Sequence, residues 1–92
     1  MTQTLIKHTI QSVYPQAEIH ILDPQHDGVH LQALVIDISF QTLPLLEQHR
    51  SIMQALEKAF ETTLHALGLK TFTPHQWENQ KENYNLNTEV DV

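Results

Sequence analysis

Apolar residues recur at two different spacings along the chain, and the changes of spacing divide it into elements. Residues 2–14 carry apolar side chains three and four positions apart, which is typical of an amphipathic helix, and Pro15 ends that pattern. Residues 17–22 and 29–37 alternate apolar and polar side chains, as strands do. The turn-forming residues 23–28 separate these two runs, so we predict a helix followed by a β-hairpin.

Helical spacing returns after Pro44 and continues to Phe60. The adjacent β-branched residues Thr62 and Thr63 weaken a helix end and favour the start of a strand. We therefore predict a second helix, followed by a third strand that ends at Phe72.

The pair Thr73-Pro74 predicts a short helix that carries Trp77. Threonine is a good N-cap, and proline at the first helical position lacks an N–H that would have no partner there. Residues 79–92 are polar, rich in asparagine and without periodicity, which indicates a flexible C-terminal tail. We expect one domain over residues 1–78, followed by this tail.

The predicted order α-β-β-α-β-α defines an α+β fold. The second and third strands are connected through a helix, so they should run parallel, whereas the hairpin strands are antiparallel. We expect a three-stranded mixed sheet with the helices packed on one face. A chain of 92 residues is long enough for a single core of this kind.

Parallel neighbouring strands begin at the same edge of a sheet, which would bring three histidines together. His65 stands at the start of the third strand, His26 lies in the hairpin loop, and His30 ends that loop. An imidazole at such a position can bind a metal, or it can hydrogen-bond to a backbone carbonyl. The residues alone leave both interpretations open, and we take all three as candidate metal ligands.

Composition narrows the choice of function. The chain has no cysteine, so a metal cluster that it helps to hold must take thiolates from another molecule. It has five Lys and Arg and a net charge of −6, which counts against high-affinity nucleic-acid binding. Neither a signal peptide nor a membrane-length apolar stretch is present, so we expect a cytoplasmic protein without membrane contact. Without a Gly-rich phosphate loop or a nucleophile motif, we do not expect an enzyme.

Several short motifs, in this order and spacing, resemble the BolA family. The match runs from about Glu18 to Trp77, and the short hairpin loop with Glu18-Ile19-His20 looks most like the IbaG subgroup. The motifs that carry the resemblance are Val29-His30-Leu31, His49-Arg50, Leu64-His65-Ala66-Leu67, Thr71-Phe72-Thr73-Pro74 and Trp77.

The resemblance implies a class II KH-like fold and a monothiol glutaredoxin as the partner. Such heterodimers share a bridging [2Fe-2S] cluster, with glutathione as a further component, and take part in iron–sulfur trafficking and in iron and stress regulation. The family's usual cluster ligand falls on His65, and a second ligand from the hairpin loop falls on His26 or His30. The isolated chain would hold no cluster tightly, and it could form a homodimer.

The resemblance also implies an alternative, because some family members are DNA-binding transcriptional regulators. Arg50, Lys58 and Lys70 would then contact phosphates. The family often has a basic residue where this chain has Gln48 and a glycine where it has Thr42; the first difference, with the acidic charge, favours the glutaredoxin role over tight DNA binding.

Four residues are candidates for contact with the partner protein, and three of them have a structural alternative. Arg50 could pair with a carboxylate instead of bordering the partner. His49 lies on the apolar side of the second helix, where a partly buried structural histidine is common, and Trp77 could cap the core instead of an interface. The candidate partner-binding residues are His49, Arg50, Lys70 and Trp77.

Overall fold

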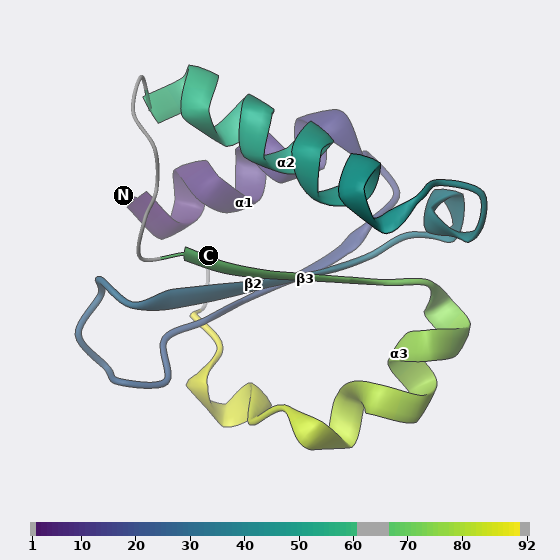
Figure 1. Cartoon of the computed structure of the whole chain (residues 1–92). Coiled ribbons are helices and arrows are strands. Elements are labelled where there is room, and N and C mark those ends of the chain that lie inside the picture. The colour runs from purple at the N-terminus through teal and green to yellow at the C-terminus, as the bar shows by residue number, and fades with distance from the viewer. Residues whose placement is uncertain (1, 61–66, 91–92) are drawn as a thin grey trace.

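A three-stranded mixed sheet forms the centre of the protein, as the order of elements predicts (Figure 1). The computed structural model describes residues 2–60 and 67–90. Strand β2 (Leu31–Ile36) is central, pairing antiparallel with β1 (Glu18–Leu22) and parallel with β3 (Leu67–Phe72). None of the helices in the described ranges is long and apolar enough to cross a membrane.

Helices α1 (Thr2–Val13) and α2 (Leu45–Phe60) cover one face of the sheet (Figure 1). The side of α2 that packs inward is a row spaced by four residues, Gln48, Ile52 and Leu56, because side chains four apart lie on one face of a helix. Leu45 and Leu46, at the start of the same helix, remain more than half exposed. The buried residues of this core are Ile6, Ile10, Ala17, Ile19, Ile21, Leu31, Ala33, Val35, Phe40, Ile52 and Leu56.

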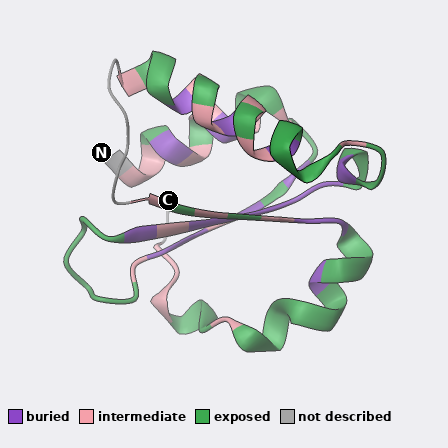
Figure 2. Cartoon of the chain, in the orientation of Figure 1, coloured by how far each residue is buried: buried purple, intermediate pink, exposed green. Residues whose placement is uncertain are grey.

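Helix α3 (Pro74–Gln80) lies on the opposite side of the sheet, so the expectation of helices on one face is wrong for this helix (Figure 1). Successive residues of β2 point to alternate faces: Ala33 and Val35 join the α1/α2 core, whereas Leu34 packs with Trp77 of α3. Because β2 is apolar on both faces, both faces need cover, and Figure 2 shows it buried between the two layers.

The Thr73-Pro74 signal is confirmed in detail. Thr73 Oγ1 accepts a hydrogen bond from the backbone N–H of Gln76 at 3.2 Å, and the backbone N–H of Thr73 donates to Gln76 Oε1 at 2.8 Å. This reciprocal arrangement is a capping box, with proline at the first helical position. It turns the chain from the end of β3 directly into α3 and so fixes where Trp77 packs.

The C-terminal segment is ordered into short turns, so the expectation of a stretch without regular structure is corrected for residues 79–90. After α3 come two 3₁₀ turns, Lys81–Asn83 and Leu86–Thr88, and then a backbone pairing with β1. The Val90 N–H donates to the Ile21 carbonyl at 2.7 Å, and the Asp23 N–H donates to the Thr88 carbonyl at 2.8 Å. A polar segment can pair in this way because backbone groups need no apolar pattern. The expected domain end at residue 78 falls inside α3.

Gln48, which stands where the sequence comparison expects a basic residue, has a structural role that needs an acceptor as well as a donor. It is 8% exposed, and its Nε2 donates to the backbone carbonyls of Phe40 at 3.2 Å and Leu43 at 2.6 Å. Its Oε1 accepts from Thr71 Oγ1 of β3 at 2.6 Å. One amide, with donor and acceptor, therefore ties the 3₁₀ turn Ile38–Gln41 and the start of α2 to the sheet.

Candidate site at the hairpin loop

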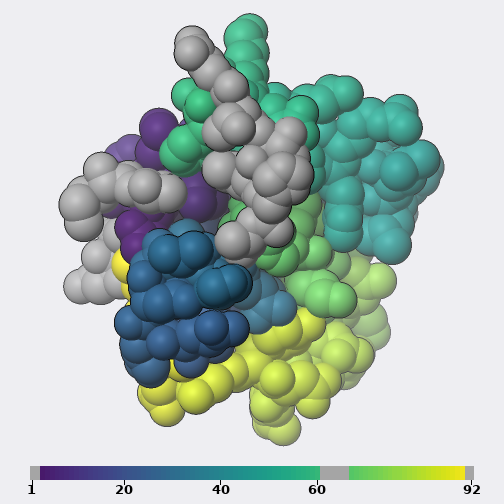
Figure 3. Space-filling model, turned by 60° about the vertical axis from the view of Figure 1, so that its left-hand side comes forward, coloured from purple at the N-terminus to yellow at the C-terminus, as the bar shows by residue number. Residues whose placement is uncertain are grey.

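The hairpin loop projects from the edge at which β2 and β3 begin together. Leu31 and Leu67, the first residues of these parallel strands, are direct partners in the register. Figure 3 shows the loop in dark blue on the surface, beside the yellow C-terminal segment. The expected common start of the two strands is thus confirmed. The first candidate ligand, His65, lies outside the described residues.

Two aspartates build the loop by accepting hydrogen bonds from its backbone. The carboxylate of Asp23 accepts from the N–H groups of Asp27 at 3.2 Å and Gly28 at 2.9 Å. Asp27 Oδ1 accepts from the N–H groups of Val29 at 2.9 Å and His30 at 3.0 Å. Because these two N–H groups bond to Asp27, the strand begins at Leu31 and not at residue 29 as predicted.

The tip of the loop requires left-handed backbone. Gly28 has φ of 69°, which glycine adopts at little cost, and His26 has φ of 54°, which is unusual for a residue with a side chain. Both residues are exposed. The turn therefore presents the His26 side chain to solvent on a tight bend.

His30 is the better oriented of the two loop histidines. Its Nδ1 lies 2.6 Å from Asp27 Oδ2, and its side chain is 58% exposed. This hydrogen bond, together with the backbone N–H groups of Val29 and His30, holds the pKa of the Asp27 carboxyl well below its usual range. A carboxylate beside Nδ1 favours the proton on that nitrogen, so Nε2 keeps the lone pair that could bind a metal.

An imidazole oriented by a carboxylate is the usual outer arrangement around a histidine that binds a metal. Within residues 2–60 and 67–90, no three His, Cys, Asp or Glu side chains are grouped so that they could hold a metal ion by themselves. The described part of the loop therefore offers a single oriented nitrogen, from His30. This imidazole nitrogen is a ligand that can complete the coordination of an iron held mainly by another molecule.

Two of the expected partner-binding residues, His49 and Lys70, are brought together from α2 and β3. His49 is half-buried, and this burial, with the nearby Lys70 charge as the second cause, lowers its pKa below the ordinary 6.5. Arg50 pairs with Glu47 at 3.0 Å on the exposed side of α2. Lys58 is exposed eight residues further along, about 12 Å from Arg50 along the helix axis. The three candidate phosphate contacts are therefore spread over two elements.

A cluster of side chains around His20 was not predicted from the sequence. Its Nε2 lies 2.5 Å from Glu18 Oε2, its Nδ1 lies 2.8 Å from Glu89 Oε2, and its ring stacks on Trp77 with centroids 5.4 Å apart. Glu18 could have been found, because residues two apart in a strand share a face. Glu89 could not, because it reaches β1 only through the folding of the C-terminal segment. Trp77 itself is 5% exposed, as the core-capping alternative expects.

The architecture and the sequence can both be compared with those of known proteins. The sheet topology and element order define an α+β domain with a three-stranded mixed sheet and the helix–strand order α-β-β-α-β-α. The profile of the family described as BolA-like protein matches residues 3–76. The chain therefore belongs to the BolA-like protein family, which confirms the resemblance noted from its motifs.

Named relatives agree with this assignment. The chain is 28% identical over 87 residues to the DNA-binding transcriptional regulator BolA of Haemophilus influenzae, covering 87% of this chain and 84% of that protein. It is 34% identical over 65 residues to BolA-like protein 1 of Bos taurus, covering 71% of this chain and 46% of that protein.

Solved structures agree on the fold. A BolA protein homologue from Coxiella burnetii superposes with a TM-score of 0.61 at 32% identity, covering 79% of this chain and 91% of the other. BolA1 from Arabidopsis thaliana superposes with a TM-score of 0.65 at 24% identity, covering 83% and 95%. The second likeness, at that identity, bears on the fold alone.

Proposed function

We propose that the protein is an adaptor that binds a monothiol glutaredoxin and shares a bridging [2Fe-2S] cluster with it in iron–sulfur trafficking. His65 would supply one ligand from this chain, and His30 would supply the second. The observation that carries the proposal is the Asp27–His30 pair at the edge where β2 and β3 begin. Family membership adds support.

The geometry of the loop favours His30 over His26 as the second ligand. Asp27 holds the His30 ring at 2.6 Å and leaves Nε2 free of that bond, whereas the described contacts of His26 involve only its backbone. A pre-oriented side chain loses less rotamer freedom on binding than an unrestrained one. His65 precedes Leu67 by two residues, and two residues of chain span at most about 7 Å. Both ligands can therefore serve one cluster at this edge.

The absence of cysteine supports a shared cluster over a resident one. Iron–sulfur clusters are held chiefly by thiolates, and this chain has none to give. Thiolates from glutaredoxin and glutathione would hold one iron, and imidazoles would replace thiolates at the other. Neutral imidazole ligands raise the reduction potential of such a cluster, as in Rieske centres. We therefore expect the shared cluster to be transferred to another protein more readily than a cluster held by thiolates alone.

Mixing experiments test the proposal. Cluster-loaded monothiol glutaredoxin, titrated with this protein, should change its visible absorption and circular dichroism as ligands exchange, and a heterodimer should elute on size exclusion. We expect His65→Ala and His30→Ala each to weaken or alter the spectral change, and His26→Ala to leave most of it. His75→Ala is the matched control, because His75 is an exposed histidine on α3.

Two results would contradict the proposal in different ways. An unchanged spectrum on mixing, with no heterodimer, would remove the glutaredoxin role altogether. A heterodimer whose spectrum changes identically with His65→Ala and with the wild type would keep the partner but remove the proposed ligand. If His26→Ala and not His30→Ala alters the spectrum, the loop ligand is His26.

DNA binding is the second candidate function, and the names of relatives favour it. The relatives from Haemophilus influenzae and from Escherichia coli are both named DNA-binding transcriptional regulators. In this chain Arg50, Lys58 and Lys70 would make the phosphate contacts, so the affinity for duplex DNA should fall steeply between two salt concentrations. Lys58→Gln should reduce both the affinity and the salt slope. Absence of binding at low salt would end this candidate.

A further inference from the structure

A pocket of about 250 Å³ lies at the end of the sheet opposite the hairpin loop. It is formed where β2 ends and α3 begins, and β2 separates it from His30 by six residues, about 20 Å of strand. The lining residues are Gln16, Glu18, Ile36, Asp37, Ile38, Pro74, Trp77 and Glu78. The proposed cluster ligands do not take part in it.

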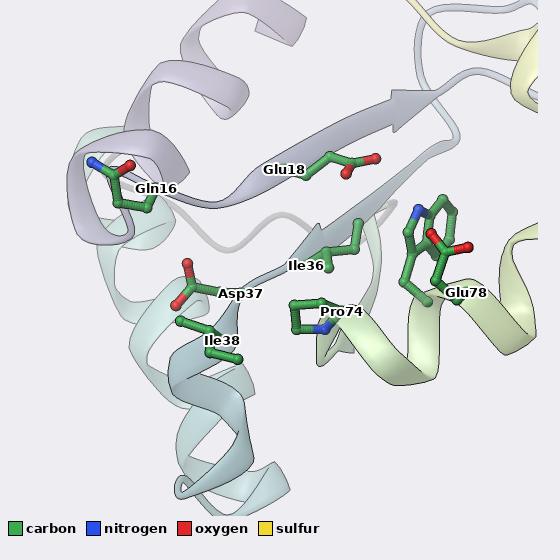
Figure 4. A pocket seen from close by; sticks show the side chains of 8 residues that line it. Gln16, Glu18, Ile36, Asp37, Ile38, Pro74 and Glu78 are labelled. Carbon is green, nitrogen blue, oxygen red and sulfur yellow. The ribbon is translucent and has the colours of Figure 1, made fainter.

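The middle of the pocket is apolar and its margin is acidic. Figure 4 shows Ile36 and Pro74 between the carboxylates of Glu18, Asp37 and Glu78, which come from β1, from the N-cap of the turn after β2 and from α3. No lysine or arginine is among the lining residues. The charge of the pocket therefore complements a cation, and its apolar middle complements an aliphatic chain.

Each of the three carboxylates already has one engaged oxygen. Glu18 Oε2 pairs with His20, Glu78 Oε2 pairs with Lys81 at 3.0 Å, and Asp37 Oδ2 accepts from Ser39. In the described part of the chain, no hydrogen bond or ion pair is found on the other oxygen of any of them. An incoming donor could bind there without displacing the existing partners.

An apolar side chain is exposed at the same place. Ile38, the first residue of the turn after β2, is 59% exposed although it is large and hydrophobic. Its neighbour Asp37 is 8% exposed and caps that turn, which holds Ile38 in position. An exposed isoleucine beside unpaired carboxylate oxygens suits a ligand that has an aliphatic stem and a charged head.

We propose that this pocket binds an arginine side chain of a partner protein. The methylene stem would lie over Ile36, Ile38 and Pro74, and the guanidinium would reach the free oxygens of Glu18 and Glu78. Arginine fits better than lysine because its planar fork can donate to two carboxylates at once. The volume is below the roughly 300–1,000 Å³ typical of small-molecule sites, so one anchoring side chain fits better than a cofactor.

The pocket is a second contact point and does not depend on the iron–sulfur role. Lys81 weakens the attraction of the pocket for a cation, because its ammonium already neutralises part of the Glu78 charge. Lys81→Gln should therefore strengthen binding of the arginine. Glu78→Gln should weaken it.

The test uses the full chain and an acetylated, amidated peptide that has one arginine between alanines. The same peptide with citrulline is the matched control, because citrulline keeps the shape and lacks the charge. Trp77 is the only tryptophan of the chain and lines the pocket, so its single indole N–H resonance in an NMR titration reports binding. We expect the arginine peptide to bind saturably with a Kd of about 1 mM, as one side-chain anchor allows. The citrulline peptide should bind much more weakly.

Variants complete the test. Glu78→Gln should weaken binding about threefold, and Lys81→Gln should strengthen it about twofold, as exposed ion pairs allow. Glu57→Gln on α2 makes the same change of net charge on the other side of the sheet and should have less than half the effect of Glu78→Gln. Equal binding of the two peptides, an equal effect of Glu57→Gln, or no saturable shift of the indole resonance up to about 10 mM peptide would each overturn the proposal.

Discussion

Asp27 shows how one side chain can shape a loop and orient a ligand at once. Its Oδ1 accepts from two backbone N–H groups, and its Oδ2 accepts from His30 Nδ1. The two hydrogen bonds from the backbone to Oδ1 end the loop. The hydrogen bond from His30 to Oδ2 decides which imidazole nitrogen keeps its lone pair. The loop conformation and the availability of His30 are therefore coupled through one carboxylate.

Asp27→Asn separates these two roles. Asparagine keeps an oxygen that can accept from the backbone, but it presents an NH₂ group to His30 Nδ1, which favours the tautomer with the proton on Nε2. We expect cluster affinity in the glutaredoxin complex to fall roughly 10- to 100-fold, as for other residues that orient a ligand. Chelator competition monitored by visible absorption measures this change.

The control for this variant is Asp23→Asn. Asp23 supports the same loop through Asp27 and Gly28 but does not contact the His30 ring. It should change cluster affinity much less than Asp27→Asn. A cluster as stable with Asp27→Asn as with the wild type would show that the orientation of His30 is unimportant.

His49 predicts a pH dependence of folding stability. Its pKa in the folded state lies below 6.5, chiefly because of burial and then because of Lys70. The unfolded state therefore binds more protons as the pH falls from about 7 through the folded-state pKa, and stability is lost over that range. His49→Gln should show a smaller loss of unfolding free energy between pH 7 and about pH 5 in urea titrations.

NMR provides the direct check on the cause. Titration of the His49 ring protons should give a pKa below the ordinary 6.5, and Lys70→Gln should raise it. An unchanged His49 titration in Lys70→Gln would mean that burial alone lowers its pKa.

At the scale of elements, the start of α3 is the feature that local sequence specifies best. The capping box of Thr73 and Gln76 uses only residues within three positions of each other. Helix α3 has seven residues and would be unstable alone, so its cap and the packing of Trp77 must act together. The direction in which the chain leaves β3 is therefore encoded in four consecutive residues.

Thr73→Ala should lower the free energy of unfolding by about 1 kcal/mol, because it removes the side-chain acceptor at the N-cap. Thermal and urea denaturation measure the change. Thr42→Ala is the control: Thr42 is an exposed threonine after a 3₁₀ turn, and its loss should change stability by less than about 0.5 kcal/mol. Equal effects of the two substitutions would argue against the cap.

At the scale of the whole molecule, the C-terminal segment completes the second layer. Tyr84 contacts the rings of Phe72 and Trp77 at centroid distances of 5.8 and 5.9 Å, and residues 88–90 pair with the free edge of β1. Without this segment, one face of the sheet and one edge would be more open to water. The segment thus contributes to folding stability despite its polar composition.

Removal of residues 84–92 should lower the free energy of unfolding by about 2–4 kcal/mol, through lost ring contacts and backbone hydrogen bonds. The α1/α2 layer should still fold, so circular dichroism should retain helix and strand. Tyr84→Ala in the full chain measures how much of this free energy comes from the aromatic contacts, and the remainder comes from the backbone hydrogen bonds. A truncated protein as stable in urea as the full chain would show that residues 84–92 contribute nothing to stability.

Much of the fold could be predicted because the signals are local. The amphipathic spacing of α1 and α2, the alternation of β1 and β2, and the Thr73-Pro74 cap each involve neighbours in sequence, and all three are confirmed. The parallel pairing of β2 and β3 followed from a helix in the connection. Family membership was also readable from the spacing of short motifs.

Tertiary structure decided what local pattern could not encode. The side of the sheet taken by α3, the contact of Glu89 with His20, the amide bridge of Gln48 and the pocket beside Ile38 all join residues distant in sequence. The loop shortened β2 because a side chain, Asp27, competed with the strand for two N–H groups. The sequence by itself determined which elements form, because helix and strand periodicity depends on near neighbours. Only the folded chain decided which polar atoms meet, because that depends on how the elements pack.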